Sequence, residues 1–125
     1  MRLLSLTDEP ALLRRVGTIF ADLILELDSY EDPWQFLEAS VNKPFDVLFV
    51  DFDALSESFA DPMNFLERIG PNKRILMIGS STLAEWHHEL RNYGAMVLHK
   101  PTTAGEIGLA LLRLMSERKL HARVG

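Results

Sequence analysis

Side chains able to do chemistry follow the apolar segments that look like β-strands. They are two acids after FDVLFV, one acid after RLLSL, a serine after RILMIG and a lysine after AMVLH, namely Asp51, Asp53, Asp8, Ser80 and Lys100. Clustered carboxylates repel one another, and a hard cation such as Mg²⁺ relieves that repulsion through oxygen ligands. A carboxylate in such a site can attack phosphorus, while a lysine and a hydroxyl neutralise the transferred oxygens. The set predicts a site for phosphoryl chemistry, provided that the fold brings these segment ends together.

Strand-like and helix-like segments alternate along the chain. The expected strands are residues 2–6, 23–27, 45–50, 74–79 and 95–99, and the expected helices are residues 9–20, 32–41, 61–70, 82–94 and 103–120. The run 45–50 is continuously apolar, which is typical of a strand buried on both faces, and Glu26 marks 23–27 as an edge strand. The alternation predicts an α/β fold with a parallel sheet covered by helices on both faces. Ligands of such sheets bind beyond the carboxyl ends of the strands.

Length and composition restrict the class of protein. The chain has 125 residues, 47% hydrophobic and 25% charged, which is typical of one globular domain. A net charge of −5 argues against direct nucleic-acid binding, because phosphates attract Lys and Arg. There is no cysteine, which excludes disulfides and thiolate metal sites and is compatible with the cytoplasmic location that we expect. No apolar run is long enough to span a membrane.

Four segments resemble the conserved segments of response-regulator receiver domains. They are LLSLTDEPALL, DVLFVDFD, ILMIGSS and VLHKPTTAGEI, and they occur in the family's order over roughly residues 2–115. The resemblance implies the flavodoxin-like receiver fold, a doubly wound parallel sheet of five strands in the order 2-1-3-4-5. It assigns residues 1–117 to this domain, and residues 118–125 to a tail or the start of a linker to an output domain.

The resemblance also implies a role for each residue of the site. Asp51 would accept a phosphoryl group from a histidine kinase or a phosphotransfer protein. Asp8, Asp51 and the backbone carbonyl of Asp53 would bind Mg²⁺. Lys100 would bridge to the phosphoryl group, Ser80 would donate its hydroxyl, and the peptide bond after Lys100 would be cis. Such a domain is no enzyme beyond Mg²⁺-dependent phosphorylation and dephosphorylation of itself.

Four positions depart from the family pattern. Thr7 replaces the first acid of the usual pair, so Mg²⁺ affinity should fall. Gly79 replaces the usual Thr or Ser, although Ser80 is one residue away. Val97 replaces an aromatic residue and Leu55 replaces a proline. These departures indicate an atypical receiver that lacks the family's usual aromatic switch.

Other interpretations remain open from the sequence. Asp51 could be a loop cap, and Ser80 could be a helix cap in competition with Ser81 and Thr82. The same fold could also serve as a pseudo-receiver, a dimerisation or docking module without phosphorylation. Asp51 and Asp53 superficially resemble the Asp-x-Asp nucleophile of haloacid-dehalogenase-type phosphatases, but Ala54 and Leu55 do not continue that motif. A flavodoxin-like cofactor binder is disfavoured because SLTDEP lacks a phosphate-cradling loop.

The last predicted helix carries a candidate contact surface. Leu109 and Leu112 project from the side opposite its core-facing stripe, which suggests contact with another protein. Receivers commonly dimerise through the surface formed here by residues 82–94, 95–99 and 103–120. We therefore expect a homodimer through this surface.

Overall fold

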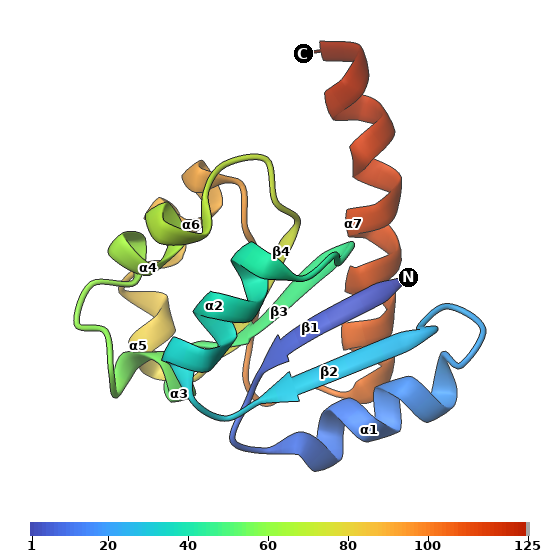
Figure 1. Ribbon diagram of the computed structural model, residues 1–125, viewed down its shortest axis with the longest axis horizontal. Helices are drawn as coiled ribbons and strands as arrows, with labels where there is room; N and C mark the ends of the chain where they lie inside the picture. Colours follow the sequence, from blue (N-terminus) through green and yellow to red (C-terminus); the bar gives the residue numbers. More distant parts are fainter. Residues whose placement is uncertain (125) are drawn as a thin grey trace.

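A parallel sheet forms the centre of the computed structural model, which describes the backbone of residues 1–124 and the side chains of residues 1–116 (Figure 1). Its strands lie in the order β2-β1-β3-β4-β5, and every neighbouring pair is parallel. They are β1 (Arg2–Leu6), β2 (Glu26–Tyr30), β3 (Val47–Asp51), β4 (Ile75–Gly79) and β5 (Met96–His99). The predicted fold class and strand order are confirmed.

Helices cover both faces of this sheet (Figure 1). The helices are α1 (Pro10–Ile19), α2 (Pro33–Asn42), α3 (Phe52–Ser56), α4 (Pro62–Ile69), α5 (Ser81–Ala84), α6 (His87–Tyr93) and α7 (Ala104–Val124). Helices α1 and α7 pack against one face, and the others lie on the opposite face. Within the described part of the chain, no helix is both long and apolar enough to cross a membrane.

Two hydrophobic clusters, one on each face, hold the sheet between its helices. In one cluster Leu13 of α1 and Leu111 of α7 pack with the sheet residues that face them. In the other cluster Phe36 of α2 and Phe65 of α4 pack with sheet residues of the opposite face. Every residue of β3 and β4 is buried. Full burial of one such apolar side chain stabilises the fold by about 1.5–3 kcal/mol, so these two strands are the rigid base on which their end residues stand.

The second strand begins three residues later than predicted. The apolar run 23–27 precedes most of β2, with Ile24 buried in the core and Leu25 exposed. The strand itself is polar because it lies at the sheet edge and is held mainly by its backbone pairing with β1, in which Ser5 lies opposite Ser29. The prediction of an edge strand was right, but hydrophobicity placed its bounds wrongly.

The helix predicted over residues 82–94 is interrupted. It consists of α5 and α6, separated at Glu85 and Trp86. There the Trp86 amide donates to the Leu83 carbonyl three residues back, in the tighter 3₁₀ pattern. The short α3, directly after Asp51, was not predicted. The last helix was predicted to end at residue 120 and continues to Val124.

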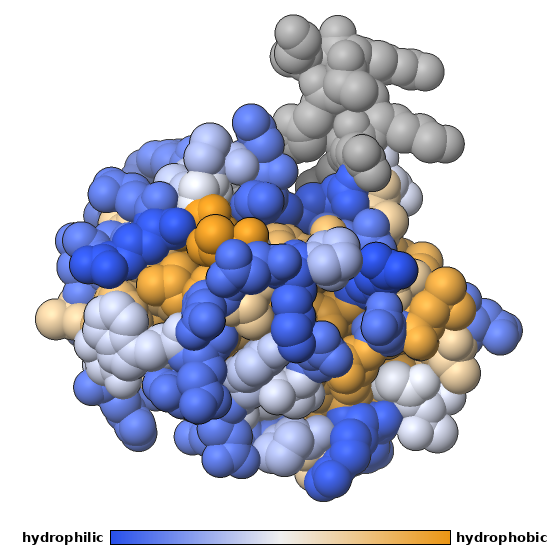
Figure 2. Space-filling view, viewed as in Figure 1, coloured by the Kyte–Doolittle hydropathy of each residue, from blue (hydrophilic) through white to orange (hydrophobic). Residues whose placement is uncertain are grey.

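The side of the molecule that Figure 2 shows is mostly hydrophilic. Apolar surface shows mainly near the connection between α1 and β2 and in the middle of the view (Figure 2). Leu109 and Leu112 on α7 are 60% and 40% exposed, as their predicted outward position requires.

Candidate functional site

The carboxyl ends of β3, β4 and β5 bring four predicted residues together. Asp51 ends β3 and caps α3, whose first turn carries Asp53. Ser80 follows β4 and precedes α5, and Lys100 follows β5. Because the strands are parallel and adjacent in the sheet, these side chains converge at the carboxyl end of the sheet. We call Thr7, Asp51, Asp53, Ser80 and Lys100 the acidic cluster.

Lys100 is the cation of the acidic cluster and contacts both of its acids. Its Nζ lies 3.1 Å from each carboxylate oxygen of Asp51 and 2.9 Å from Oδ2 of Asp53. The Lys100 amide donates to the Gly79 carbonyl at 2.8 Å, which fixes the start of the segment against β4. The Lys100–Pro101 peptide bond is cis, as predicted. Two carboxylates therefore share one ammonium group.

Ser80 binds the side chain of Asp53 rather than that of Asp51. Its hydroxyl donates to Asp53 Oδ1 at 2.8 Å, and its amide donates to the same oxygen at 3.3 Å. The position before it must be glycine, because a Cβ on Gly79 would lie 2.9 Å from the Cβ atoms of Phe52 and Leu83. This close packing explains why the hydroxyl stands at residue 80 and not at 79.

Thr7 points into the acidic cluster and Asp8 does not. The Thr7 side chain is buried and donates to Asp51 Oδ2 at 3.4 Å, while its oxygen accepts the Glu9 amide at 3.0 Å. Asp8 is exposed. Consecutive residues at a strand end face opposite ways, so an inward Thr7 turns Asp8 outward. The predicted grouping of Asp8 with Asp51 and Asp53 is not what the structure shows.

Burial and pairing shift the pKa values of the charged groups in different directions. Asp51 is only 1% exposed, and its desolvation raises its pKa above the ordinary value even though Lys100 opposes this. Burial also acts upward on the pKa of Asp53, but the hydrogen bonds from Lys100 and Ser80 outweigh it and the pKa is lowered. Burial acts downward on the pKa of Lys100, and its bonds to Asp53 and Asp51 raise it overall. The cluster therefore holds one acid, Asp51, whose charged form is disfavoured by burial, beside another, Asp53, whose charged form is favoured by its hydrogen bonds.

In this arrangement the protein's own hydrogen bonds occupy the carboxylate oxygens that would bind Mg²⁺. Mg²⁺ requires oxygen ligands at about 2.0–2.1 Å. All four carboxylate oxygens of Asp51 and Asp53 already accept hydrogen bonds from groups of the protein. Among the residues that the structure describes, no group of three or more His, Cys, Asp or Glu lies together as a metal site would. Lys100 supplies the positive charge between the two acids.

Three interactions near the site were missed at the level of sequence. The sequence pointed to the backbone carbonyl of Asp53, whereas its carboxylate makes the contacts. Thr7 was read as a lost acid, although its hydroxyl binds Asp51. His87 of α6 and His99 of β5 stack with an interplanar angle of 4°, and their ring nitrogens lie 2.7 Å apart. A hydroxyl or acid at each strand end was a usable signal, but the pairing of two histidines twelve residues apart required the fold.

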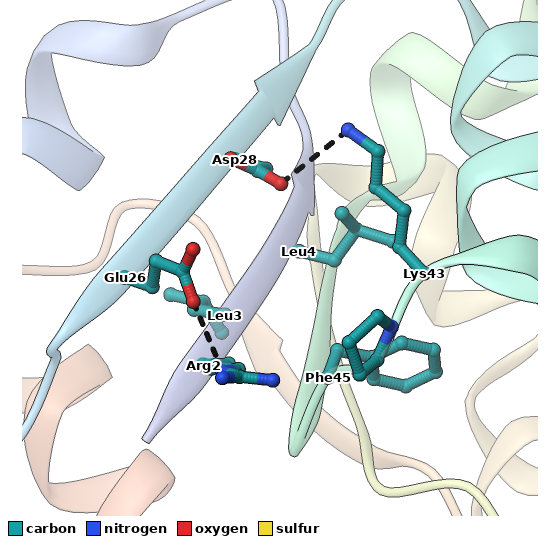
Figure 3. Close-up of a pocket in the computed structure, with 8 residues that line it drawn as sticks. Arg2, Leu3, Leu4, Glu26, Asp28, Lys43 and Phe45 are labelled. Carbon is teal, nitrogen blue, oxygen red and sulfur yellow. Dashed lines mark ion pairs between the residues drawn. The ribbon is translucent and has the colours of Figure 1, made fainter.

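A hollow of about 360 Å³ lies at the opposite end of the sheet (Figure 3). Its charged lining residues pair with one another. Arg2 Nε lies 3.0 Å from Glu26 Oε2, and Lys43 Nζ lies 3.6 Å from Asp28 Oδ2. These side chains are 48–61% exposed. We call these four residues the amino-end pairs; their charges balance, so the hollow offers a ligand little net charge.

No protein-family model and no curated protein matches the chain. Solved structures do. The crystal structure of adenylate cyclase from Rhodopirellula baltica has a TM-score of 0.75 and 21% identity, over 98% of this chain and 92% of that chain. A response regulator receiver domain protein from Clostridium thermocellum has a TM-score of 0.68 and 19% identity, over 95% of this chain and 97% of that chain. Full-length FixJ from B. japonicum has a TM-score of 0.76 and 16% identity, over 98% of this chain and 61% of that chain.

This chain has the fold of response-regulator receiver domains. Identities of 16–21% establish the shared receiver fold, and the activity has to be argued from the site itself. In this fold the acidic cluster lies at the carboxyl ends of the strands, where ligands of doubly wound proteins bind.

Proposed function

We propose that the chain is a receiver domain of signal transduction that accepts a phosphoryl group on Asp51. One observation carries this proposal: Lys100 contacts both oxygens of Asp51 at 3.1 Å at the carboxyl end of the sheet. A carboxylate held beside a fixed ammonium is equipped to form an acyl phosphate, because the ammonium offsets the negative charge that the phosphoryl group brings.

Each residue of the acidic cluster has a defined part in the proposed transfer. An oxygen of Asp51 forms a bond to phosphorus as the P–N bond of a phosphohistidine donor breaks. The leaving imidazole keeps the bonding electron pair and takes a proton from water. Lys100 neutralises the phosphoryl oxygens, the Ser80 hydroxyl donates to one of them, and Thr7 and the Asp53 amide hold Asp51 in position.

The proposed donor is a histidine kinase or a phosphotransfer protein, and the proposed location of the chain is the cytoplasm. The proposed output is a change in the surface formed by α6, β5 and α7, through which a homodimer or a following output domain would respond. Supporting this, His99 of β5 directly precedes Lys100 and contacts His87 of α6, so movement at Lys100 reaches that surface in one step. Leu109 and Leu112 expose apolar area on α7 for such a contact.

Mg²⁺ dependence remains a separate part of the proposal. The resemblance to receiver domains implies that phosphorylation depends on Mg²⁺. The ammonium of Lys100 already lies between the two acids, so we expect that dependence to be weak. Phosphorylation is therefore to be measured both with Mg²⁺ and with a chelator.

Intact-mass measurement after incubation with a small phosphodonor, such as acetyl phosphate, tests the proposal. We expect an adduct of one phosphoryl group that is absent from Asp51→Asn. Asp46→Asn, which removes an acid outside the cluster, serves as the matched control and should form the adduct. An adduct that persists in Asp51→Asn would contradict the assigned acceptor.

A second function is favoured by the burial of Asp51. At 1% exposure, with both oxygens bonded within the protein, Asp51 is closed to a donor in this conformation. A pseudo-receiver that docks or dimerises without phosphorylation would need nothing more than this arrangement. Absence of any adduct, with an unchanged oligomeric state after treatment, would favour this second function.

A further inference from the structure

The carboxylate of Asp53 occupies the two groups to which the proposed function assigns the phosphoryl oxygens. Ser80 donates its hydroxyl to Asp53 Oδ1 at 2.8 Å, and Lys100 donates to Asp53 Oδ2 at 2.9 Å. Neither bond is incidental to the local turn, because Asp53 is 27 residues from Ser80 and 47 from Lys100. One anionic group thus spans the ends of β3, β4 and β5.

We propose that the side chain of Asp53 is an internal stand-in for the phosphoryl group. It holds the Ser80 hydroxyl and the Lys100 ammonium in the positions that the phosphoryl group would otherwise impose. This inference rests on the proposed function, and it assigns regulation of that same site to a residue of the chain itself.

The chemistry of the contacts supports the substitution. A carboxylate and a phosphoryl group both present negatively charged oxygens that accept charge-assisted hydrogen bonds. The Lys100 ammonium and the Ser80 hydroxyl and amide together bind both oxygens of the Asp53 carboxylate. The side chain is 29% exposed, whereas that of Asp51 is 1% exposed, so Asp53 lies on the solvent side of the acceptor.

Two consequences follow for the site. A phosphoryl group that reaches Asp51 has to displace the Asp53 carboxylate from Ser80 and Lys100, which slows its entry. Until that happens, the bonds from the Ser80 amide and hydroxyl to Asp53 hold the start of α5 against the first turn of α3. Asp53 is therefore a positioning residue. It occupies the hydrogen-bond donors of Ser80 and Lys100, and it holds the start of α5.

The test compares the rate of adduct formation from acetyl phosphate in the wild type, Asp53→Asn and Asp53→Ala. We expect faster formation in both variants, by about tenfold in Asp53→Ala, which corresponds to one charge-assisted hydrogen bond that no longer has to be broken. A merely disruptive substitution would slow the reaction, so the direction of the change separates the two roles. Glu57→Gln, an exposed acid just beyond the end of α3, removes the same charge and should react at the wild-type rate.

The outcomes separate this inference from the proposed function. An adduct in the wild type with no acceleration in either variant overturns the stand-in role and leaves Asp51 as acceptor. An adduct that forms only in the Asp53 variants supports the stand-in role. No adduct in any form overturns the proposed function, and the stand-in role falls with it. Amide resonances of Ser80 and Ser81 provide a readout without phosphodonor, and we expect them to shift in Asp53→Ala and not in Glu57→Gln.

Discussion

The two ends of the sheet both carry charged side chains, and they use them in opposite ways. At the carboxyl end, two acids share the single ammonium of Lys100, and one of them is 1% exposed. At the amino end, Arg2 and Lys43 each have a partner of their own, and all four side chains are 48–61% exposed (Figure 3). The number of ion pairs is similar, but the surroundings differ.

The difference shows where charge is costly enough to indicate a function. An exposed pair exchanges good hydration for weak attraction and contributes about 0–1 kcal/mol. A buried acid loses its hydration, and its charged form is stable only with a paired cation and hydrogen bonds. Such a residue is therefore more informative about function than an exposed one. The acidic cluster has the second character, which is why the proposed chemistry lies there and not in the hollow at the other end.

Removal of Lys100 should have the largest effect. In Lys100→Met the buried carboxylate of Asp51 loses its cation, and we expect a loss of about 3 kcal/mol in the free energy of unfolding at pH 7. Urea denaturation followed by circular dichroism measures it. Lys43→Met, at the amino-end pairs, is the matched control and should leave the denaturation midpoint nearly unchanged. Equal midpoints for the two variants would contradict the proposed contrast between the ends.

Neutralising Asp51 should have a smaller effect of opposite sign. Desolvation raises the pKa of Asp51 in the folded state, so the charged form is disfavoured there and stability falls as pH rises through that pKa. Asp51→Asn removes this cost while Lys100 keeps Asp53, and we expect a gain of about 1 kcal/mol at pH 7.

Thermal unfolding at two pH values checks this gain. At pH 3 the wild-type carboxyl is protonated in both states, so the advantage of Asp51→Asn should disappear. A variant that is less stable than the wild type at pH 7 would show that the Lys100 contact outweighs desolvation.

The pH dependence of Asp53 should be weaker and should run the other way. Its pKa is lowered in the folded protein, so its stabilising contribution is complete above the unfolded value of 3.8 and is lost as pH falls through the folded value. Between about pH 5 and pH 2 the wild type should lose roughly 0.5–1 kcal/mol more than Asp53→Asn. Denaturant titrations of both proteins across this range measure the difference, and parallel curves would contradict it.

The fold was largely predictable because hydrophobic pattern and topology rules act together. The runs at 45–50 and 74–79 are buried on both faces, and alternation with helices leaves few arrangements. The edge strand β2 was misplaced because its residues Glu26–Tyr30 are held by backbone bonds rather than by apolar burial. The break at Glu85 and Trp86 was missed because the helical pattern of residues 82–94 runs through it without a helix-breaking residue.

Most members of the site were predictable from the sequence, and their contacts were not. Strand ends identified Asp51, Ser80 and Lys100, since parallel topology forces them together. Side-chain direction decided the rest: Thr7 faces inward and Asp8 outward, and Asp53 offers its carboxylate instead of its carbonyl. A metal site with Asp8 followed from the sequence pattern and stays a prediction; in the structure Asp8 is exposed and Thr7 contacts Asp51 instead.

The smallest expected effect lies in the amino-end pairs. Arg2 and Glu26 join the edge strand β2 to β1 at a contact of 3.0 Å, with side chains 55% and 61% exposed. Glu26→Gln keeps the shape and removes the charge, and we expect a change below about 0.5 kcal/mol that vanishes in 1 M salt, where the Debye length is about 3 Å. The effect of Lys100→Met should persist in the same salt, because ions do not screen a pair whose acid is buried. Urea titrations of both variants at low and high salt test this, and a salt-independent loss in Glu26→Gln would mean that exposure does not separate the two ends of the sheet.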